Sequence, residues 1–331
     1  MKFGKVPLAL AKGAVLAHSV SVKTGRLRKG RVLSADDIAA LDAAGVHDVI
    51  VAQLGPADVG EDAAARRLAT AVLGQGRGLS QTKPFTGRVN LLAGGAGVVA
   101  LNVAALEAVN AVHPMITIAT VPPWQQMRSG GMVATIKIIS YGVAETDLAR
   151  ACAAAGRGGV DLRAPVLKTA TLIITEIPGG AGDKGRDAIA DRLRALCVDL
   201  SAVEMVPHRR ASLAKAIAAC RSDLVLVLTG SATSDIDDVA PGALRAAGGV
   251  VTRFGMPVDP GNLLFLGQIG PRPVIGLPGC ARAPALNGAD WVLSRVICGV
   301  PVTSADIAGM GVGGLLKEIP TRPQPRRGRK T

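Results

Sequence analysis

Aromatic residues are scarce in this 331-residue chain, since phenylalanine, tryptophan and tyrosine together make up 2% of it. The core must therefore be built from aliphatic residues, and base stacking on aromatic side chains is not favoured. No apolar run reaches the roughly 18 residues that a membrane-spanning helix needs, and the longest candidate, 91–101, contains three glycines. No signal-peptide pattern follows Met1, so we expect a cytoplasmic protein.

Cysteine is also scarce and dispersed. The five cysteines form no CxxC pair, which excludes the usual structural zinc patterns and a disulfide framework. Glycine (41 residues) and proline (20 residues) are abundant by contrast, so the chain must turn often. Hydrophobic residues make up 49% of the sequence, enough to bury a sizeable core, and this composition predicts an α/β protein.

Acidic residues are outnumbered. Lys and Arg total 38 against 25 Asp and Glu, giving a net charge of +13, and five positive charges lie in the proline-rich tail at 322–330. The rest of the chain is moderately basic and has no motif for reading bases. This balance favours an anionic small molecule, such as a phosphate-bearing cofactor, over nucleic acid.

The first 160 residues predict an α+β region. Ser34 and Asp37 have the spacing of a capping box, so a helix should begin at residue 35 and end near Gly45. Apolar periodicity and turn residues predict further elements: helices over 58–73 and 103–112, and strands over 48–54, 116–121 and 132–139. The Ala-, Pro- and Gly-rich stretch 153–165 is the candidate interdomain linker.

From residue 165 to 300 the sequence predicts an α/β domain, followed by an extension over 301–331. Strand-like runs alternate with helical ones, as parallel βαβ units require. The expected strands are 171–177, 202–206, 223–230, 250–254 and 273–279, and the expected helices are 185–197, 212–220, 238–248 and 284–299. Ligands of such sheets bind beyond the carboxyl ends of the strands. The candidate binding loops are therefore 177–185, 229–238, 256–262 and 277–283.

The loop 229–238 carries the densest set of functional groups. Four hydroxyl side chains and three carboxylates fall within ten residues: Thr229, Ser231, Thr233, Ser234, Asp235, Asp237 and Asp238. Backbone N–H groups before a helix can bind an anion, and the carboxylates can hold a divalent cation. The alternative is a helix N-cap followed by acidic residues in the first turn.

The other loops leave two interpretations open. Gly179 and Gly180 suit a phosphate cradle or a plain turn, since 177–185 matches neither the P-loop nor the dinucleotide fingerprint. Cys280 is an activated thiolate near a helix start or a small packing residue. His208 faces the ligand or is solvated. Asp259 and Asn262 flank a Pro-Gly turn that can also present polar groups.

The order of these pieces resembles the molybdopterin-binding domain of the molybdenum cofactor biosynthesis proteins, above all the molybdopterin molybdotransferases. In that family a TGG-SxG-xxD loop, a PG turn and a GLPGNP loop follow one another. Here TGSATSDIDD, MPVDPGN and GLPGCARAPA stand in the same order within 168–298. The resemblance implies a three-layer α/β/α domain with a mostly parallel sheet. Residues 12–20 and 27–51 are more weakly similar to the segment that precedes this domain in the family.

The resemblance also implies roles for individual positions. It places Thr229, Gly230, Thr233 and Asp238 in the loop that binds the phosphate or nucleotide of the ligand. It also assigns Pro260 and Gly261 to the turn beside that loop, and Pro278 and Gly279 to the last loop. Several positions depart from the family pattern: Ser231 in TGG, Asp235 in SxG, Asn262 after the turn, Cys280 in GLPGNP, and His208 where an acidic residue is usual. These departures favour ligand binding over molybdate insertion itself.

The function that the resemblance implies is binding of molybdopterin or adenylylated molybdopterin, with assistance to molybdate insertion. Asp235, Asp237 and Asp238 would be catalytic, with Mg²⁺ held by Asp235 and Asp238. Alternatives are a non-catalytic carrier or partner of a cytidylyltransferase, a nucleotide hydrolase on the same fold, and a polyanion-binding module that uses the tail. The tail is similar to the linker that joins such a domain to a cytidylyltransferase in some relatives. We expect a homo-oligomer and neither a membrane nor a nucleic-acid partner.

Overall fold

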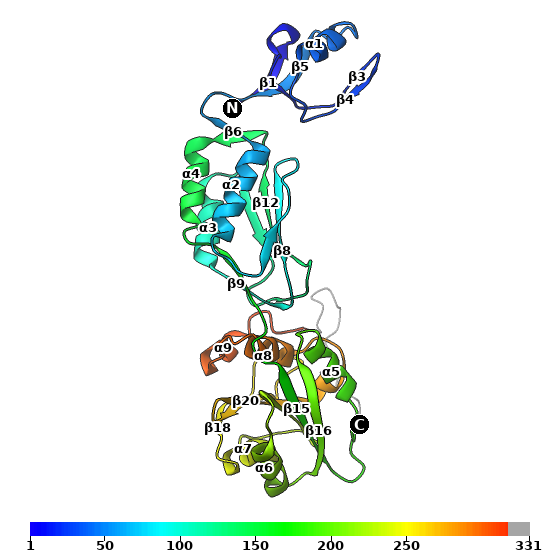
Figure 1. Ribbon diagram of the computed structural model, residues 1–331, viewed down its shortest axis with the longest axis vertical. Coiled ribbons are helices and arrows are strands. Elements are labelled where there is room, and N and C mark those ends of the chain that lie inside the picture. The colour runs from blue at the N-terminus through cyan, green and yellow to red at the C-terminus, as the bar shows by residue number, and fades with distance from the viewer. Residues whose placement is uncertain (317–331) are drawn as a thin grey trace, which may run out of the picture. The chain divides into compact units, whose positions relative to one another are not determined.

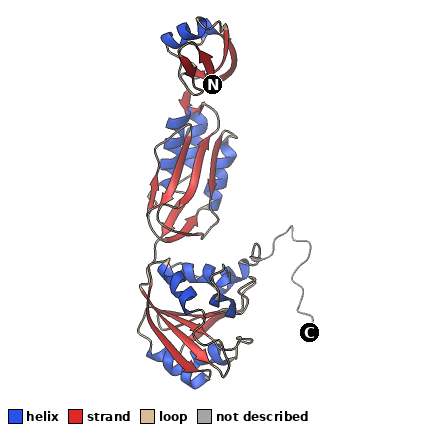
Figure 2. Cartoon of the chain, turned by 90° about the vertical axis from the view of Figure 1, so that its right-hand side faces the viewer, coloured by secondary structure: helices blue, strands red, loops and turns tan. Residues whose placement is uncertain are grey.

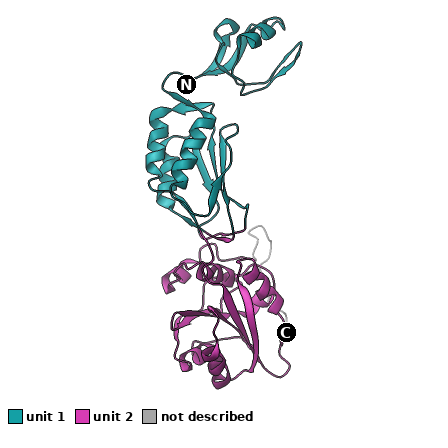
Figure 3. Ribbon diagram, viewed as in Figure 1, with its two compact units in different colours: residues 1–95, 99–123, 129–162 teal, residues 96–98, 124–128, 163–331 magenta. Residues whose placement is uncertain are grey.

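The computed structural model describes residues 1–316, which form two compact units (Figure 3). Unit 1 comprises residues 1–95, 99–123 and 129–162, and unit 2 comprises 96–98, 124–128 and the chain from 163 onward. The sequence did not predict that two short segments of the N-terminal half belong to unit 2. The basic tail at 322–330, with its predicted linker role, lies outside the described residues.

The first part of unit 1 is a small sheet packed on one helix. Ser34 and Asp37 form the predicted capping box, and helix α1 follows it. Leu16, Leu41 and Val51 lie in the core between sheet and helix. The elements are β1 (Lys2–Pro7), η1 (Leu8–Leu10), β2 (Val15–Leu16), β3 (Val20–Val22), β4 (Gly25–Leu27), α1 (Ala35–Asp42) and β5 (Asp48–Gln53), with sheet orders β1-β5-β2 and β3-β4.

The second part of unit 1 is a four-stranded antiparallel sheet with helices packed on one face (Figure 1). Its strand order is β10-β12-β8-β7, and α2 packs on the central strands β8 and β12. The main elements are α2 (Glu61–Leu73), β7 (Leu79–Gln81), β8 (Arg88–Ala93), α3 (Val103–Val112), β10 (Ile116–Thr120), β12 (Met132–Ile138) and α4 (Glu145–Ala154).

Five short strands complete this half of the chain. They are β6 (Asp58–Gly60), β9 (Gly97–Leu101), β11 (Gln126–Met127), β13 (Gly142–Ala144) and β14 (Val160–Arg163), in the orders β13-β6 and β11-β9-β14. The predicted helix over 58–73 is wrong at its start, because Asp58–Gly60 pairs with β13 and the helix begins at Glu61. The predicted linker 153–165 contains the end of α4 and all of β14.

Unit 2 is built on a six-stranded sheet in the order β16-β15-β17-β20-β19-β18. Its strands are β15 (Thr169–Glu176), β16 (Asp199–Pro207), β17 (Leu224–Leu228), β18 (Val250–Phe254), β19 (Phe265–Ile269) and β20 (Arg272–Leu277). Its helices are α5 (Arg186–Arg194), α6 (Arg210–Ala219), α7 (Val239–Ala246), η2 (Gly279–Arg282), α8 (Gly288–Ile297) and α9 (Ser304–Gly309). The pairs of β16 with β15, β15 with β17 and β17 with β20 are parallel.

Helices cover both faces of this sheet (Figure 2). Side chains alternate along each strand, so Leu226 packs in a core with α5 and α8, and Val225 and Val227 pack in a second core with α6 and α7. This confirms the predicted three-layer α/β/α domain with a mostly parallel sheet. It also explains the unbroken apolar runs, because strands buried on both faces do not alternate with polar residues.

One strand of unit 2 was not predicted. β19 pairs antiparallel with both β18 and β20, so this end of the sheet is not built of parallel βαβ units. A tight turn at 270–271, with Gly270 at φ +55°, joins β19 to β20. Among the described residues, no helix has the length and apolarity that crossing a membrane requires.

Candidate functional site

The loops predicted to bind a ligand meet at one edge of the unit 2 sheet. Parallel strands all end at the same edge, so the loops after β15, β17 and β20 start side by side. The antiparallel strand β19 begins opposite the last residues of β20, with Phe265 paired to Gly276. The turn before β19, which contains 259–262, therefore approaches the same edge.

Thr175 joins three strand ends at this edge. Its side-chain hydroxyl accepts a hydrogen bond from the backbone N–H of Gly230 at 2.9 Å and lies 2.8 Å from Nδ1 of His208. Thr175 is only 1% exposed. A Cβ on Gly230 would lie 2.6 Å from the carbonyl oxygen of Thr175, so this close approach requires glycine. The structure thus brings together His208 and Gly230, two of the predicted site residues.

This arrangement has a consequence for the imidazole of His208. The Thr175 hydroxyl oxygen accepts a hydrogen bond from the Gly230 N–H, and among the described residues Nδ1 of His208 is the acceptor within reach of its own O–H. We therefore assign the neutral imidazole its proton on Nε2. The backbone N–H of His208 donates to the carbonyl of Glu176 at 3.0 Å, which fixes the start of the loop as well.

The carboxylate of Asp238 caps helix α7. It accepts the N–H of Ser234 at 2.9 Å on one oxygen and the N–H of Val239 at 2.6 Å on the other. The Ser234 hydrogen bond contributes most to lowering the pKa of Asp238 below its ordinary 3.8, partial burial opposes this effect, and the Val239 hydrogen bond adds to it. The loop 229–238 is thus folded around Asp238.

The other polar residues of this loop have local partners or face solvent. Thr233 is buried, and its hydroxyl lies 3.4 Å from that of Thr229. Asp237 is exposed and forms an ion pair with Arg245 at 2.6 Å. Asp235 accepts the N–H of Asp237 at 2.7 Å. Ser231, which is exposed, has no side-chain hydrogen bond among the described residues.

The donor set of this loop does not fit a metal site. Within residues 1–316 no group of three or more His, Cys, Asp or Glu side chains is close enough to hold a metal ion. Both carboxylate oxygens of Asp238 already accept backbone N–H groups. Binding of Mg²⁺ by Asp235 and Asp238 stays a prediction.

The loops 177–185 and 277–283 are linked by Arg282. Its guanidinium donates to the carbonyl oxygens of Gly182 (3.3 Å), Lys184 and Thr229 (3.0 Å). It thereby connects the loops after β15, β17 and β20. Gly179 and Gly180, both exposed, lie in the first of these loops, and Gly179 has φ +71°.

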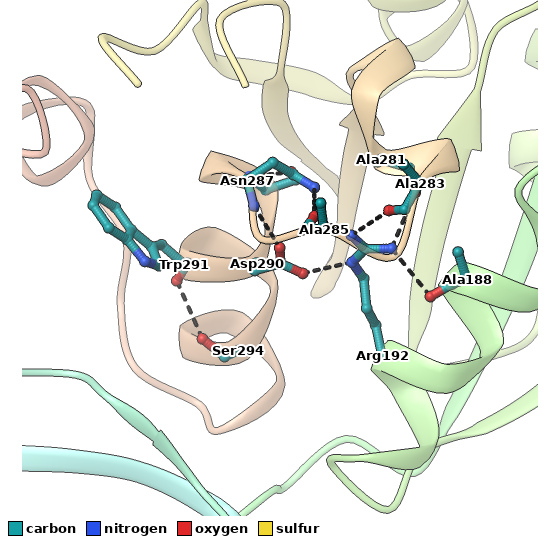
Figure 4. A network of polar contacts seen from close by, with 10 residues as sticks. Ala188, Arg192, Ala281, Ala283, Ala285, Asn287, Asp290, Trp291 and Ser294 are labelled. Atoms are coloured by element: carbon teal, nitrogen blue, oxygen red, sulfur yellow. Dashed lines mark hydrogen bonds and ion pairs between the residues drawn. The ribbon is translucent and has the colours of Figure 1, made fainter. Parts of the chain in front are cut away.

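A second arginine orders the segment between β20 and α8 (Figure 4). Arg192 of α5 forms a 2.5 Å ion pair with Asp290, and the two side chains are 12% and 15% exposed. The same guanidinium donates to the carbonyls of Ala188, Ala281, Ala283 and Ala285. Since four backbone carbonyls and one carboxylate converge on one side chain, the segment 281–290 has a fixed path.

The last loop begins on this fixed segment. Pro278 is buried and precedes the 3₁₀ turn η2, Gly279 is exposed, and Cys280 is half-buried within η2. Asn287 is fully buried and, with Asp290, forms the capping box of α8. Contact of Pro278, Gly279 and Cys280 with a ligand stays a prediction.

The turn 259–262 is tied to the start of α8. The carbonyl of Pro260 accepts the N–H of Gly288 at 2.8 Å, and a Cβ on Gly261, where φ is +146°, would lie 2.8 Å from that nitrogen. The exposed Asn262 donates its side-chain N–H to the carbonyl of Met256 at 3.4 Å. The peptide bond between Asp259 and Pro260 is cis. These contacts fix the shape of the turn.

The sequence prediction missed Thr175, Arg192 and Arg282. Thr175 directly follows three apolar residues, Leu172 to Ile174, near the end of a strand-like run, and that position was a usable signal. Arg282 stands in a Gly- and Pro-rich loop at a strand end, which was also a signal. Nothing in the sequence marks Arg192, because its partners come from residues about 90 positions away.

Fold and loops together define unit 2 as a three-layer α/β domain that presents its loops at the carboxyl edge of a mostly parallel sheet, where such domains bind ligands. Residues 166–296 match the family model described as "Probable molybdopterin binding domain". This part of the chain is a molybdopterin-binding domain of the molybdenum cofactor biosynthesis type. Residues 5–53 match a model described as a domain of unknown function. No curated protein matches the chain in sequence.

Among solved structures, the molybdopterin biosynthesis enzyme MoaB from Thermus thermophilus aligns with 22% identity over 46% of this chain and 100% of its own, with a TM-score of 0.31. The molybdopterin biosynthesis MoeA protein from Pyrococcus horikosii aligns with 13% identity over 94% of this chain and 76% of its own, with a TM-score of 0.27. The CinA protein of unknown function from Thermoplasma acidophilum aligns with 15% identity over 35% of this chain and 90% of its own, with a TM-score of 0.30. These TM-scores are low, so the likenesses carry no functional argument.

Proposed function

We propose that unit 2 binds molybdopterin, or its adenylylated form, at the carboxyl edge of its sheet and assists molybdate insertion. The observation that carries this proposal is the family match over 166–296, together with the loops that meet at this edge. The roles of the predicted site residues and of molybdate are part of the proposal. The predicted cytoplasmic location, homo-oligomer and cytidylyltransferase partner also stay predictions.

Backbone N–H groups of the loop 229–238 are suited to a phosphate. Among the described residues, the N–H groups of Ser231, Ala232 and Thr233 have no hydrogen-bond acceptor, whereas those of Gly230 and Ser234 are used by Thr175 and Asp238. Three consecutive N–H groups before the start of α7 can converge on an anion. In this mechanism Asp238 and Thr175 position the loop, and the N–H groups bind the ligand.

Positive charge around the edge supports an anionic ligand. Arg209 and Arg210 follow His208 at the end of β16, and Arg210 donates to the carbonyl of Asp237 at 3.0 Å. Lys184 is exposed in the loop after β15. Cations that surround a binding edge raise the local concentration of an anionic ligand and strengthen its binding.

A non-catalytic carrier is the second candidate. The observation that favours it is the Asp238 carboxylate, whose two oxygens are both occupied by backbone N–H groups. A carboxylate held in this way stabilises the loop and has less capacity to act on a phosphate. The carrier would bind the same ligand at the same edge and release it unchanged to a partner.

The test is calorimetric binding of molybdopterin and of adenylylated molybdopterin, with and without Mg²⁺ and molybdate, followed by product analysis. Binding with molybdate incorporation or AMP release supports an insertion enzyme, and binding without either product supports the carrier. Release of phosphate or AMP from free nucleotides supports the hydrolase. Failure of both pterin ligands to bind contradicts the proposal.

Gly230→Ala is the matching loss-of-site variant. Its new Cβ would meet the Thr175 carbonyl at 2.6 Å, so the loop must shift and binding should weaken at least about tenfold, or about 1.4 kcal/mol. Gly4→Ala is the control, because a Cβ at Gly4 meets nothing within 4 Å. Equal affinities of the two variants would place the ligand elsewhere.

A further inference from the structure

Arg282 is a partly buried arginine of this edge, and no acidic partner among the described residues compensates its charge. Among the described residues, no carboxylate lies within ion-pair distance of its guanidinium, whose three acceptors are the uncharged carbonyls of Gly182, Lys184 and Thr229. Arg192 is paired with Asp290, and Arg245 with Asp237. Partial burial lowers the pKa of Arg282, and no nearby acid opposes this effect.

A half-buried cation without a counter-charge is unfavourable unless something else supplies the negative charge. Carbonyl oxygens satisfy N–H groups but do not neutralise a guanidinium. Of its five N–H groups, the hydrogen bonds to the three carbonyls use two on Nη1 and one on Nη2. The Nε–H and the second Nη2–H remain available for an anion.

The chain is also built closely around this side chain. At Gly185, where φ is +100°, a Cβ would lie 2.7 Å from Cα and 2.8 Å from Cβ of Arg282. The loop after β15 therefore packs against the stem of Arg282 at a position that only glycine allows. The hydrogen bond to the carbonyl of Thr229 places the guanidinium at the first residue of the loop 229–238. The available N–H groups of residues 231–233 belong to that same loop.

We propose that Arg282 binds the phosphate of the ligand and makes the site specific for the phosphorylated pterin over its dephosphorylated form. This inference rests on the proposed function. The carbonyls of Gly182, Lys184 and Thr229 hold the guanidinium, the two remaining N–H groups donate to phosphate oxygens, and the N–H groups of 231–233 bind the same anion from another side. Arg282 is then a specificity-determining residue that sequence reasoning did not select.

The test compares two ligands and two proteins by calorimetry. The ligands are molybdopterin and molybdopterin from which a phosphatase has removed the phosphate, and the proteins are the wild type and Arg282→Gln. Hydrogen bonds between charged groups predict that the wild type prefers the phosphorylated ligand by about 10- to 100-fold. In Arg282→Gln that preference should fall to about threefold or less, while the dephosphorylated ligand keeps its affinity.

Arg194→Gln is the matched control. This exposed arginine lies at the C-terminal end of α5, away from the carboxyl edge, and its substitution removes the same charge. The variant should keep the wild-type preference. Because Arg282 also holds three loop carbonyls, Arg282→Lys provides a second variant that keeps the charge with fewer donors. Its preference should fall between those of the wild type and Arg282→Gln.

Two results overturn the inference and are distinguishable from failure of the proposed function. If Arg282→Gln and Arg282→Lys keep the wild-type preference for the phosphorylated ligand, Arg282 does not contact the phosphate. If Arg282→Gln weakens both ligands by the same factor, its role is to hold the loops. If the wild type binds neither ligand, the proposed function itself fails.

Discussion

The two large sheets of the molecule bury their strands in different ways. In unit 2, β17 is buried at all five positions and β15 at six consecutive ones, because helices cover both faces. In unit 1, β8 alternates between buried and partly exposed residues, because helices cover one face only. The strands of the unit 2 sheet read as continuous apolar runs and those of the unit 1 sheet as alternating ones, as expected for parallel and antiparallel sheets.

This difference determines where a site can form. A parallel sheet buried on both faces has no free surface for a ligand, but its strand ends all lie at one edge, where the loops converge. An antiparallel sheet sends successive connections to opposite ends, so its loops do not gather in the same way. The functional residues of this protein are therefore expected at the carboxyl edge of unit 2.

The largest loss of stability is expected from shortening a side chain on a strand that is buried between two layers of helices. Leu226→Ala in β17 leaves a cavity in a core closed by α5 and α8, so the free energy of unfolding should fall by about 2–5 kcal/mol. The same change at Leu92, which is partly exposed on β8, should cost less than about 1 kcal/mol. Urea denaturation of both variants measures the difference. Equal losses would mean that the two sheets are buried alike.

A smaller effect is expected from removing a hydroxyl at a strand end. Thr175→Val leaves the half-buried N–H of Gly230 without its acceptor and should lower the free energy of unfolding by about 1 kcal/mol. Thr135→Val is the counterpart in unit 1, where the hydroxyl accepts a 3.2 Å hydrogen bond from exposed Arg88, and its effect should stay within about 0.5 kcal/mol. Urea denaturation again compares the two variants.

Imidazole ¹⁵N spectra provide a second measurement on the same variant. In the wild type the neutral ring of His208 should carry its proton on Nε2, because the Thr175 hydroxyl donates to Nδ1. Thr175→Ser should preserve that spectrum and Thr175→Val should change it. An unchanged His208 spectrum in Thr175→Val would contradict the assigned hydrogen bond.

The smallest effect is expected at the cap of α7, and it depends on pH. Asp238→Ala should cost about 1 kcal/mol at pH 7 because the helix loses its N-cap. The folded-state pKa of Asp238 is lowered, so its charge stabilises the protein above about pH 3.8 and this contribution is lost as the pH falls through the lowered pKa. Denaturant unfolding at a series of pH values between pH 2 and pH 7 measures how the free energy of unfolding depends on pH.

Asp238→Asn separates the cap from the charge. Asparagine also caps helices, but its single amide oxygen can accept only one of the two backbone N–H groups, so this variant should keep part of the stability at pH 7 and lose the pH-dependent part. A variant that retains the full pH dependence of the wild type would show that other carboxylates, such as Asp223 or Asp306, produce it.

The sequence alone determined most of the elements of unit 2 and the loops that follow its strands. Apolar runs and helical periods predicted β15, β17 and β20, and the motif order indicated the molybdopterin-binding domain that the family match identifies. β19 escaped prediction because an antiparallel strand entered by a Pro-Gly turn has the same local pattern as a loop followed by a short apolar run.

Only the tertiary structure decided how the side chains at the edge are paired. The sequence allowed Asp238 to be a metal ligand or a helix cap, and the folded loop directs two backbone N–H groups onto its carboxylate. The sequence could not identify the partners of Thr175, Arg192 and Arg282, because those partners lie up to 100 residues away in the chain. Local propensity follows from neighbouring residues, whereas hydrogen bonds between loops exist only once the strands are in register.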